Sequence, residues 1–483
     1  MAAGCRIAQR RVSLGDPHDC TDATDQLTIL RALCDTLVTR AGQGFGPGLA
    51  TGWDVSADAR RWRFALRAHH RFHDGAPCDA TAVAQSLRRM ARPDKGYTLG
   101  APGVWRQYLG DARIEPVDDV TLSIDLAEPL ADLPDILEHG FIVAPDCLAR
   151  WDRGEDAEIV GSGPYRVTRR TQDMVAAARV PGHFADAPHD EVTWIAAPDA
   201  DARFAMLRDG TVDVANDLAA RDAGGAAITL HDYLSPVAII FLLNAARGPL
   251  ADPRLRRALG LAIDRQRIVD EVLSGRARPL HGFVSPVHFG APPAEPMPHD
   301  PALARSLIAD AGLAGGLVLG VDCPSSLPDE AQRLTQALRD QLAEVGVTLD
   351  VHVHTQREDY AHMVRRKEIR DMCVFDSSPL STFRVLHEKI DARVAGSWWQ
   401  GYRNTRVEDL LDAARREVGD TVRATHYARA YAELQEDPPW LTLYNPARTI
   451  GLAGSHPGFA MPADGIIDVT ALPRVLSSAP RPA

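Results

Sequence analysis

The order of elements predicted between residues 237 and 355 constrains the fold of this chain more than any other feature. The run VAIIFLLN, residues 237–244, has the length and apolar composition of a buried strand. Two helices are predicted next, because Asp252 and Asp264 can each cap the first turn of a helix. Further along, VTLDVHVHT places alternate apolar residues on one face of another strand. Strands that alternate with helices in this way predict an α/β fold.

Further helix and strand signals extend this pattern along the chain. The segment DPALARSLIADAGL repeats the Asp-Pro start, with Asp300 as the cap and Gly312 as the residue that ends the helix. A helix from about residue 329 to 345 is expected to end at Gly346. Nearer the N-terminus, RRWRFALR alternates polar and apolar residues like a strand, and Asp79 can cap the helix that follows.

Length and charge limit the classes of protein to consider. A chain of 483 residues predicts two or more lobes with separate cores. The formal net charge of −12 disfavours nucleic acid and anionic membrane surfaces as partners, because both require clustered Lys and Arg. The longest apolar candidate, PVAIIFLLNAA, is far shorter than the roughly 18 apolar residues of a membrane-spanning helix. We therefore expect no nucleic acid partner and no embedding in a membrane.

The cysteines and histidines do not form a recognisable metal-binding motif. The seven cysteines are scattered without a CxxC pair, and we expect most of them to be buried, although a Cys5–Cys20 disulfide is an open alternative. His69, His70 and His73 flank a turn, and we favour a solvated loop over a metal site there. The segment HEKID begins like a zinc-protease helix, but an aspartate replaces the second histidine. The sequence predicts neither a metal nor another cofactor.

No catalytic motif stands out. The GxSxG nucleophile elbow is absent, and GQGFGPG carries Pro47 where a phosphate-binding loop would enter a helix. Spacing alone marks no pair of carboxylates as an acid and a base. We therefore expect a binding protein and not an enzyme.

Two adjacent tryptophans, Trp398 and Trp399, lie in the segment GSWWQGY. Neighbouring residues of a strand point to opposite faces, so both cannot be core residues of one strand. Either one ring lines a binding cleft, or both rings pack against neighbouring helices.

A polar segment from Asp376 to Thr382, in which serines surround Pro379, predicts a turn that leads into a helix near Phe383. The open N–H groups at such a helix start attract a carboxylate. The alternative is a helix whose own side chains cap these groups, and the sequence leaves both possibilities open.

Several segments together resemble the family 5 extracellular solute-binding proteins, which include dipeptide-, oligopeptide- and nickel-binding receptors of ABC transporters. The resemblance extends from about Cys5 to Leu472. The matching segments, in chain order, are GLATGWDVSADARRWRFALRAHHRFHDGAPCDATAVAQSL, GSGPYRV, FLLNAARGPLADPRLRRALGLAIDRQRIVDEVLSG, DPALARSLIADAGL, and PLSTFRVL followed by GYRNTRVEDLLDAAR.

The resemblance implies a two-lobed α/β fold of the periplasmic-binding-protein type, which closes around its ligand. The first lobe would be discontinuous and would comprise residues 1–41, 161–236 and 452–483, the last including the C-terminal tail. Residues 42–160 would form an inserted subdomain, and residues 237–451 would form the second lobe.

The resemblance also implies where a ligand binds. In peptide-binding members an aspartate anchors the amino group of the peptide, and an ungapped match places Phe375 at that position, with Asp376 one residue later. The expected ligand-binding residues are Asp376, Ser377, Ser378, Thr382, Arg384, Trp398 and Trp399.

The expected function is that of a solute-binding receptor of an ABC transporter. It would capture a peptide or a similar small polar organic ligand in an interlobe cleft and present it to the permease. Such a receptor is expected to be periplasmic and monomeric, although the N-terminal segment MAAGCRIAQRRVSLGDPHDC lacks the apolar run of a secretory signal. The alternative is a cytoplasmic protein with the same fold, repurposed for ligand sensing or catalysis.

Overall fold

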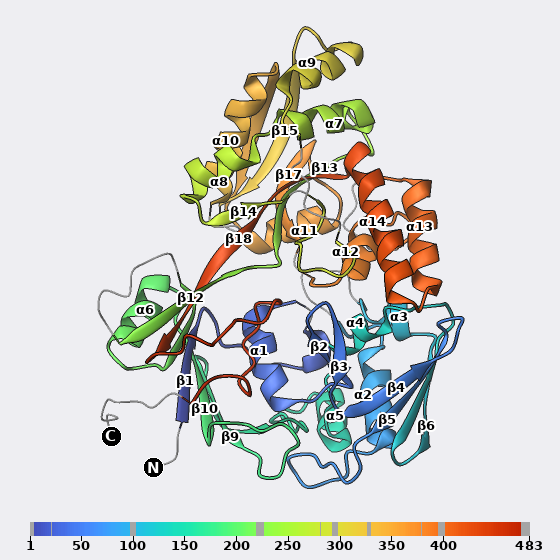
Figure 1. Ribbon diagram of the computed structural model, residues 1–483, viewed down its shortest axis with the longest axis vertical. Coiled ribbons are helices and arrows are strands. Elements are labelled where there is room, and N and C mark those ends of the chain that lie inside the picture. Colours follow the sequence, from blue (N-terminus) through green and yellow to red (C-terminus); the bar gives the residue numbers. More distant parts are fainter. Residues whose placement is uncertain are drawn as a thin grey trace. The chain divides into compact units, whose positions relative to one another are not determined.

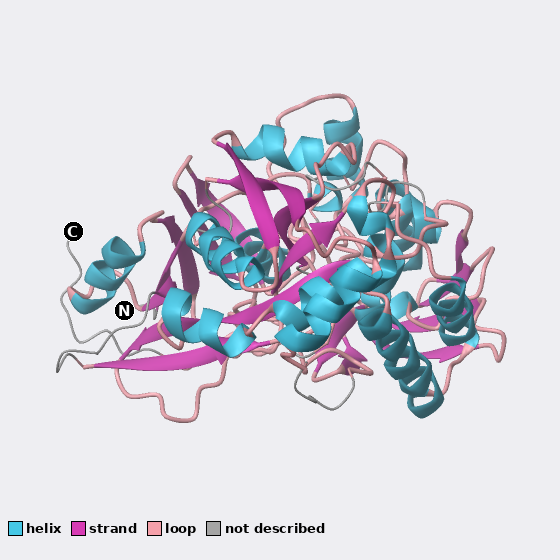
Figure 2. Ribbon diagram, turned by 90° about the horizontal axis from the view of Figure 1, so that it is seen from above, coloured by secondary structure: helices cyan, strands magenta, loops and turns pink. Residues whose placement is uncertain are grey.

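Helices and strands are interspersed along the chain, which confirms the predicted α/β class (Figure 2). The structure is a computed structural model. It describes residues 4–20, 22–96, 103–218, 227–280, 282–291, 298–325, 330–377, 379–394 and 401–474.

The chain divides into two compact units. The first comprises Met1–Thr98, Pro102–Tyr233 and Arg448–Ala483, and the second comprises Leu99–Ala101 and Leu234–Ala447. The first unit is therefore discontinuous in sequence. It holds residues 42–98 and 102–160 together with its other segments, and a separate inserted subdomain stays a prediction.

The main sheet of the first unit is built around a short N-terminal strand. Its strands are β1 (Gly4–Gln9), β8 (Tyr165–Arg170), β9 (Met174–Arg179), β10 (Glu191–Ala196), β11 (Val214–Leu218), β12 (Ile228–Leu234) and the end of β18 (Trp440–Ala453). The order is β18-β11-β1-β10-β9-β8, and β12 also pairs with β18. Strand β1 is parallel to β10 and β11. Burial on both sides explains why most of β1 is apolar.

A second, antiparallel sheet of the first unit has the order β4-β5-β7-β6. Its strands are β4 (Ala50–Val55), β5 (Arg61–Leu66), β6 (Arg113–Asp118) and β7 (Thr121–Asp125), and β2 (Val38–Ala41) forms a hairpin with β3 (Gly44–Pro47). In β5, Trp62, Phe64 and Leu66 are buried and alternate with exposed residues. This alternation confirms the strand predicted from RRWRFALR.

Helices cover the strands of the first unit. They are the short 3-10 helix η1 (Pro17–Asp19) and the α-helices α1 (Thr24–Leu33), α2 (Ala80–Met90), α3 (Arg106–Leu109), α4 (Leu133–Leu137), α5 (Pro145–Asp152) and α6 (Ala200–Arg208). The side chain of Asp79 caps α2, as predicted, by accepting a hydrogen bond from Ala82 N over 2.9 Å. The apolar face of α2 packs on β6 and β7 (Figure 1).

The second unit contains one mixed sheet. Its strands are β13 (Ala238–Leu243), β14 (Ala277–Pro279), β15 (Leu317–Pro324), β16 (Val347–His354), β17 (Met372–Ser377) and the start of β18. The order is β16-β15-β17-β13-β18, and β14 also pairs with β18. Strand β15 is parallel to β16 and β17, whereas β13 is antiparallel to β17 and β18. Every residue of β13 is buried, which confirms the buried strand predicted there.

Three helices of the second unit begin at the aspartates that the sequence predicted as caps. The helices of this unit are η2 (Pro249–Ala251), α7 (Pro253–Ala262), α8 (Arg265–Leu273), α9 (Pro301–Asp310), α10 (Ala331–Ala343), α11 (Arg357–Arg365), α12 (Thr382–Lys389), α13 (Thr405–Arg416) and α14 (Asp420–Glu436). Asp252, Asp264 and Asp300 accept hydrogen bonds from backbone N–H groups in the first turns of α7, α8 and α9. Helices α8 and α10 lie side by side next to the sheet (Figure 1).

The cysteines behave as buried apolar residues. All seven lie among the described residues, are buried and carry free thiols, so Cys5 and Cys20 do not form a disulfide. Among the residues that the structure describes, no helix has both the length and the apolar character needed to cross a membrane.

Candidate functional site

The predicted ligand-binding residues fall at the end of one strand and the start of the next helix. Asp376 and Ser377 end β17, and Thr382 and Arg384 lie in the first turn of α12. Ser378, Trp398 and Trp399 lie outside the described residues, so both possibilities for the tryptophan rings stay open.

A loop of the same unit fixes the turn between β17 and α12. His288 Nε2 lies 2.9 Å from the carbonyl oxygen of Pro379, and His288 Nδ1 lies 3.1 Å from that of Ser285. Thr382 Oγ1 donates to the carbonyl oxygen of Phe289 over 2.5 Å. His288 and Thr382 are both buried. Thr382 therefore holds the start of α12 against this loop, and its hydroxyl proton already forms a hydrogen bond within the protein.

The first turn of α12 is capped by its own sequence. Ser381 Oγ accepts a hydrogen bond from the backbone N–H of Arg384 over 3.1 Å, and Ser381 is buried. Of the two possibilities that the sequence left open, the self-capped helix is the one observed for this N–H group.

The guanidinium of Arg384 pairs with a carboxylate one turn later. Arg384 Nε lies 2.9 Å from Glu388 Oε1, and its terminal nitrogen lies 3.3 Å from Glu388 Oε2. The Arg384 side chain is 2% exposed and that of Glu388 is 11% exposed. Two parallel hydrogen bonds of this kind are among the strong ones in proteins. An anionic ligand at Arg384 would therefore compete with Glu388.

Ser377 has unused hydrogen-bonding capacity. Its hydroxyl is buried, and it has no hydrogen-bond partner among the described residues. Leaving a buried hydroxyl unpaired costs about 1–3 kcal/mol. Asp376, its neighbour on β17, is half-buried. Ser377 and Asp376 thus place a hydroxyl and a carboxylate at the end of one strand.

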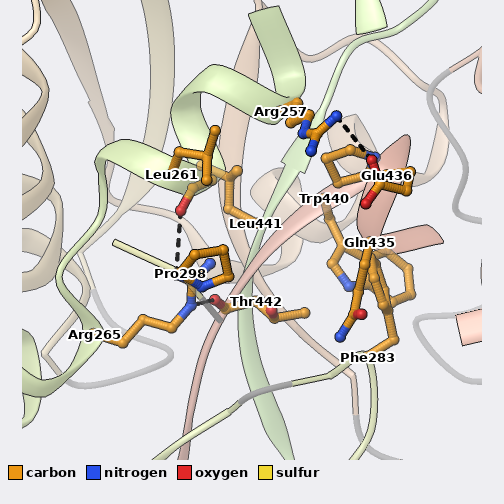
Figure 3. Close-up of a pocket in the computed structure, with 12 residues that line it drawn as sticks. Arg257, Leu261, Arg265, Phe283, Pro298, Gln435, Glu436, Trp440, Leu441 and Thr442 are labelled. Carbon is orange, nitrogen blue, oxygen red and sulfur yellow. Dashed lines mark hydrogen bonds and ion pairs between the residues drawn. The ribbon is translucent and has the colours of Figure 1, made fainter. Parts of the chain in front are cut away.

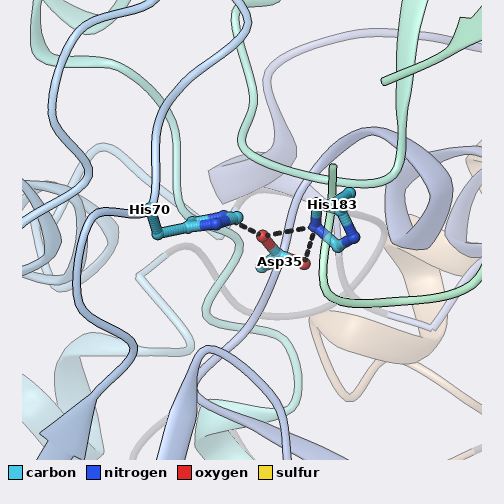
Figure 4. A group of neighbouring side chains, drawn as sticks. All are labelled: Asp35, His70 and His183. Carbon is cyan, nitrogen blue, oxygen red and sulfur yellow. Dashed lines mark hydrogen bonds and ion pairs between the residues drawn. The ribbon is translucent and has the colours of Figure 1, made fainter. Parts of the chain in front are cut away.

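A cluster in the first unit joins Asp35, His70 and His183 (Figure 4). These residues follow α1, β5 and β9, respectively. Asp35 Oδ2 lies 2.8 Å from His70 Nε2 and 3.3 Å from His183 Nε2. The three side chains are at most 10% exposed.

The geometry of this cluster favours hydrogen bonds among its three side chains over a bound metal ion. One ligand atom from each residue lies within 4.8 Å of the others, which is close enough to hold a metal. However, the backbone N–H of Ala185 donates to His183 Nδ1 over 3.0 Å, so the proton of the neutral ring is on Nε2. His70 Nε2 faces two acceptors, Asp35 and the carbonyl oxygen of Ser162, and therefore also donates. The cluster is a carboxylate that accepts hydrogen bonds from two imidazoles.

The environment keeps the carboxyl group of Asp35 ionised. Burial by itself raises the pKa of this carboxyl, but the hydrogen bonds from His183 and His70 lower it. The pKa of Asp35 is lowered overall, so the favourable contacts outweigh burial. The cluster thus ties three loops of the first unit together.

The expectation of a solvated loop at His70 and His73 is wrong. His70 is held by Asp35, and His73 Nε2 donates to the carbonyl oxygen of Gly163 over 3.0 Å. Burial lowers the pKa of His73, so its ring is neutral. These partners are distant in sequence, and no local pattern points to them.

Comparison with known families gives one match that covers most of the chain. A family described as "Bacterial extracellular solute-binding proteins, family 5 Middle" matches residues 44–383. The glutathione-binding protein GsiB of Salmonella paratyphi A is 32% identical over 313 residues, or 62% of this chain and 59% of that protein. The match thus spans less than two thirds of that relative. GsiB of Pectobacterium atrosepticum is 27% identical over 456 residues, or 89% of this chain and 85% of that protein.

Solved structures share the fold at low sequence identity. HbpA2 from Haemophilus parasuis has a TM-score of 0.80 and 22% identity, with 96% of this chain and 97% of that chain covered. The ABC transporter substrate-binding protein CtaP from Listeria monocytogenes has a TM-score of 0.81 and 20% identity, covering 97% and 99%. The periplasmic binding protein DppA from Helicobacter pylori, in complex with the peptide STSA, has a TM-score of 0.76 and 20% identity, covering 94% of each chain. The predicted periplasmic-binding-protein-like fold is confirmed.

Proposed function

The chain belongs to the family 5 bacterial extracellular solute-binding proteins, and from this we propose that it is a solute-binding receptor for a short peptide or a similar small polar organic ligand. The observation that carries the proposal is the family match over residues 44–383. This range runs from β3 to the first turn of α12 and includes the predicted ligand-binding residues Asp376, Ser377 and Thr382.

The class of ligand is supported by relatives and by the end of β17. The first relatives named above bind glutathione, a tripeptide. Asp376 would pair with a ligand ammonium in a charge-assisted hydrogen bond. Ser377 would complete its unused hydrogen bond with a polar group of the ligand. We propose Trp398 or Trp399 as an apolar wall, because an indole ring supplies a large contact area and one N–H donor.

The proposed receptor acts with a membrane partner. We infer that it delivers its ligand to an ABC transporter permease, from a periplasmic location, and that it works as a monomer. No chemistry on the ligand is required for this role. The family description, which places its members outside the cytoplasm, supports this assignment over a repurposed cytoplasmic protein.

A thermal-shift screen tests the proposed function. The full chain is heated with glutathione, with di-, tri- and pentapeptides, and with glucose as an unrelated probe. A ligand at about a hundredfold excess over its dissociation constant stabilises the folded state by about 2.7 kcal/mol. At least one peptide should raise the melting temperature, whereas glucose should not. A screen in which no peptide raises it contradicts the proposal.

A further inference from the structure

The pocket beside α7 and β18 in the second unit encloses its main polar groups (Figure 3). Arg265 and Trp440 line it, but these residues are only 5% and 1% exposed. Arg265 donates hydrogen bonds to the carbonyl oxygens of Thr442 and Gly260 instead, and so ties α7 to β18. A ligand site requires polar side chains that a ligand can reach.

Strand β16 presents two such side chains, both histidines. His352 and His354 are two residues apart, so their side chains lie on the same face of the sheet. His352 is exposed, and the side chain of His354 is 22% exposed. Both imidazoles are therefore within reach of solutes in the surrounding water.

A buried carboxylate of β15 fixes the ring of His354. His354 Nε2 lies 2.9 Å from Asp322 Oδ1, and the Asp322 side chain is 3% exposed. An ionised carboxylate only accepts hydrogen bonds, so Nε2 carries the proton and the lone pair of the neutral ring is on Nδ1. The centre of the Tyr360 ring lies 5.3 Å from the centre of the His354 ring. A carboxylate that orients a histidine in this way is typical of metal sites.

Asp322 is itself held in place by Arg370. The backbone N–H of Arg370 donates to Asp322 Oδ2 over 2.8 Å, and its Nε lies 3.4 Å from Asp322 Oδ1. Arg370 also pairs with Asp350, which shares the polar face of β16, over 2.9 Å. Two carboxylates and one guanidinium thus lie near His352 and His354. This excess of negative charge favours a bound cation.

The ring of His352 can complete a site with Nδ1 of His354. Among the residues that the structure describes, neither nitrogen of His352 and no Nδ1 of His354 forms a hydrogen bond. The two ring centres lie 4.6 Å apart. Bonds from a metal to imidazole nitrogen are about 2.0–2.1 Å long, so two imidazoles on one ion have ring centres about 5 Å apart. Exposed side chains change rotamer within nanoseconds, which lets the His352 ring turn towards a shared ion.

We propose that His352 and His354 form a binding site for a divalent late first-row metal ion, with water as the remaining ligands. Imidazole nitrogens suit Zn²⁺, Cu²⁺ and Ni²⁺, whereas Mg²⁺ prefers oxygen ligands. Asp322 is a positioning residue for His354. The sequence did not predict this site, because Asp322 lies 32 positions before His354. The site is independent of the proposed receptor function, since none of its residues belongs to the segment predicted to bind the peptide.

Calorimetric titration of the full chain with Zn²⁺, in a buffer that does not bind metals, tests the proposal. We expect saturable binding of Zn²⁺ that Mg²⁺ does not reproduce. His352→Asn and His354→Asn should each weaken it by about tenfold or more, because two linked ligands hold an ion far better than one. His352→Asn should keep the wild-type stability, since its exposed ring has no hydrogen-bond partner among the described residues.

His69→Asn is the matched control. His69 is also exposed, and its φ of 60° is one that asparagine tolerates. This variant should bind Zn²⁺ as the wild type does.

Three outcomes overturn the proposal. The first is the absence of saturable Zn²⁺ binding to the wild-type protein. The second is Zn²⁺ binding that His352→Asn and His354→Asn both leave unchanged, since the ion would then lie elsewhere. The third is equally tight binding of Mg²⁺, which would assign the ion to carboxylates. Peptide titration of His352→Asn separates these results from the receptor function, because its peptide affinity should equal that of the wild type.

Discussion

Asp35 Oδ2 accepts a hydrogen bond from His70 Nε2 over 2.8 Å, which joins two residues that lie 35 positions apart. His183 completes the cluster from a third loop, and the centre of its ring lies 4.3 Å from the centre of the Phe184 ring. Arg67 in turn lies 4.0 Å over the Phe184 ring. The first unit thus uses one buried carboxylate and a stack of planar groups to hold loops that follow a helix and two strands.

The Asp35 cluster should contribute measurably to stability. Asp35→Asn removes the charge that both imidazoles contact, and hydrogen bonds to charged groups are worth about 1.5–3 kcal/mol each. We expect the free energy of unfolding in urea to fall by about 2–3 kcal/mol. The control is Asp125→Asn, which breaks the exposed pair with Arg61 and should change little. Equal free energies of unfolding for Asp35→Asn and the wild type would show that the cluster does not stabilise the fold.

His18 should make the protein lose stability in mild acid. The ring is buried, its Nδ1 accepts from Arg89 and its Nε2 donates to the carbonyl oxygen of Phe141, each over 3.0 Å. Burial lowers the pKa of His18 to about 4, with the Arg89 charge acting in the same direction and Asp16 opposing it. Because the folded state favours the neutral ring, its stabilising effect is complete above about pH 6.5 and is lost as the pH falls towards 4.

The size of this effect can be measured with a variant that cannot titrate. A lowering of the His18 pKa from 6.5 to about 4 corresponds to about 3 kcal/mol of unfolding free energy. His18→Gln should therefore show a flatter decline in unfolding free energy between pH 6.5 and 4 than the wild type. An NMR titration that places the pKa of His18 near 6.5 in the folded protein would contradict the prediction.

Ser377→Ala should separate ligand binding from folding. It removes a buried hydroxyl without a hydrogen-bond partner among the described residues, so the free energy of unfolding should stay the same or rise by up to about 1 kcal/mol. Peptide affinity should fall at the same time. Ser381→Ala is the matched control, since it removes the α12 cap and should cost about 1 kcal/mol of stability without affecting affinity. If Ser377→Ala lowered stability but kept the wild-type affinity for peptides, Ser377 would not be part of the binding site.

Asp376→Asn tests the proposed anchor for an amino group. A carboxylate that pairs with an ammonium binds it more strongly than an amide can. The variant should therefore bind tripeptides with a free amino group more weakly, but bind their N-acetylated forms as well as the wild type does. Titration calorimetry with matched free and acetylated peptides measures both. The same loss for both forms, or no loss for either, would rule out an ammonium contact.

Local sequence signals explain which parts of the fold could be predicted. The capping aspartates act on backbone groups two or three residues away, and the apolar strand β13 needs only its own composition to be identified. Strand β18 was not predicted, because it runs through both units and contains Pro446, which lacks an N–H donor for a sheet. The carbonyl oxygen of Pro446 accepts a hydrogen bond from the backbone N–H of Ser235 over 2.9 Å.

The candidate sites depended more on contacts between distant residues. The turn before α12 was predicted, but the sequence left open whether the N–H groups at the start of the helix attract a carboxylate or are capped by its own side chains. In the structure, Ser381 caps Arg384 N. The burial of Arg265 could not be predicted from the sequence DRQR, since an arginine that follows a capping aspartate usually lies on the surface. Its carbonyl partner on Thr442 lies 177 positions away.

Calorimetric titration of glutathione and of unmodified di- and tripeptides into the full chain tests the central claim, that this protein is a peptide-binding receptor, most directly. The account predicts that at least one of them binds with one-to-one stoichiometry. The absence of saturable binding for every peptide, at concentrations where the folded protein is stable, would contradict the account.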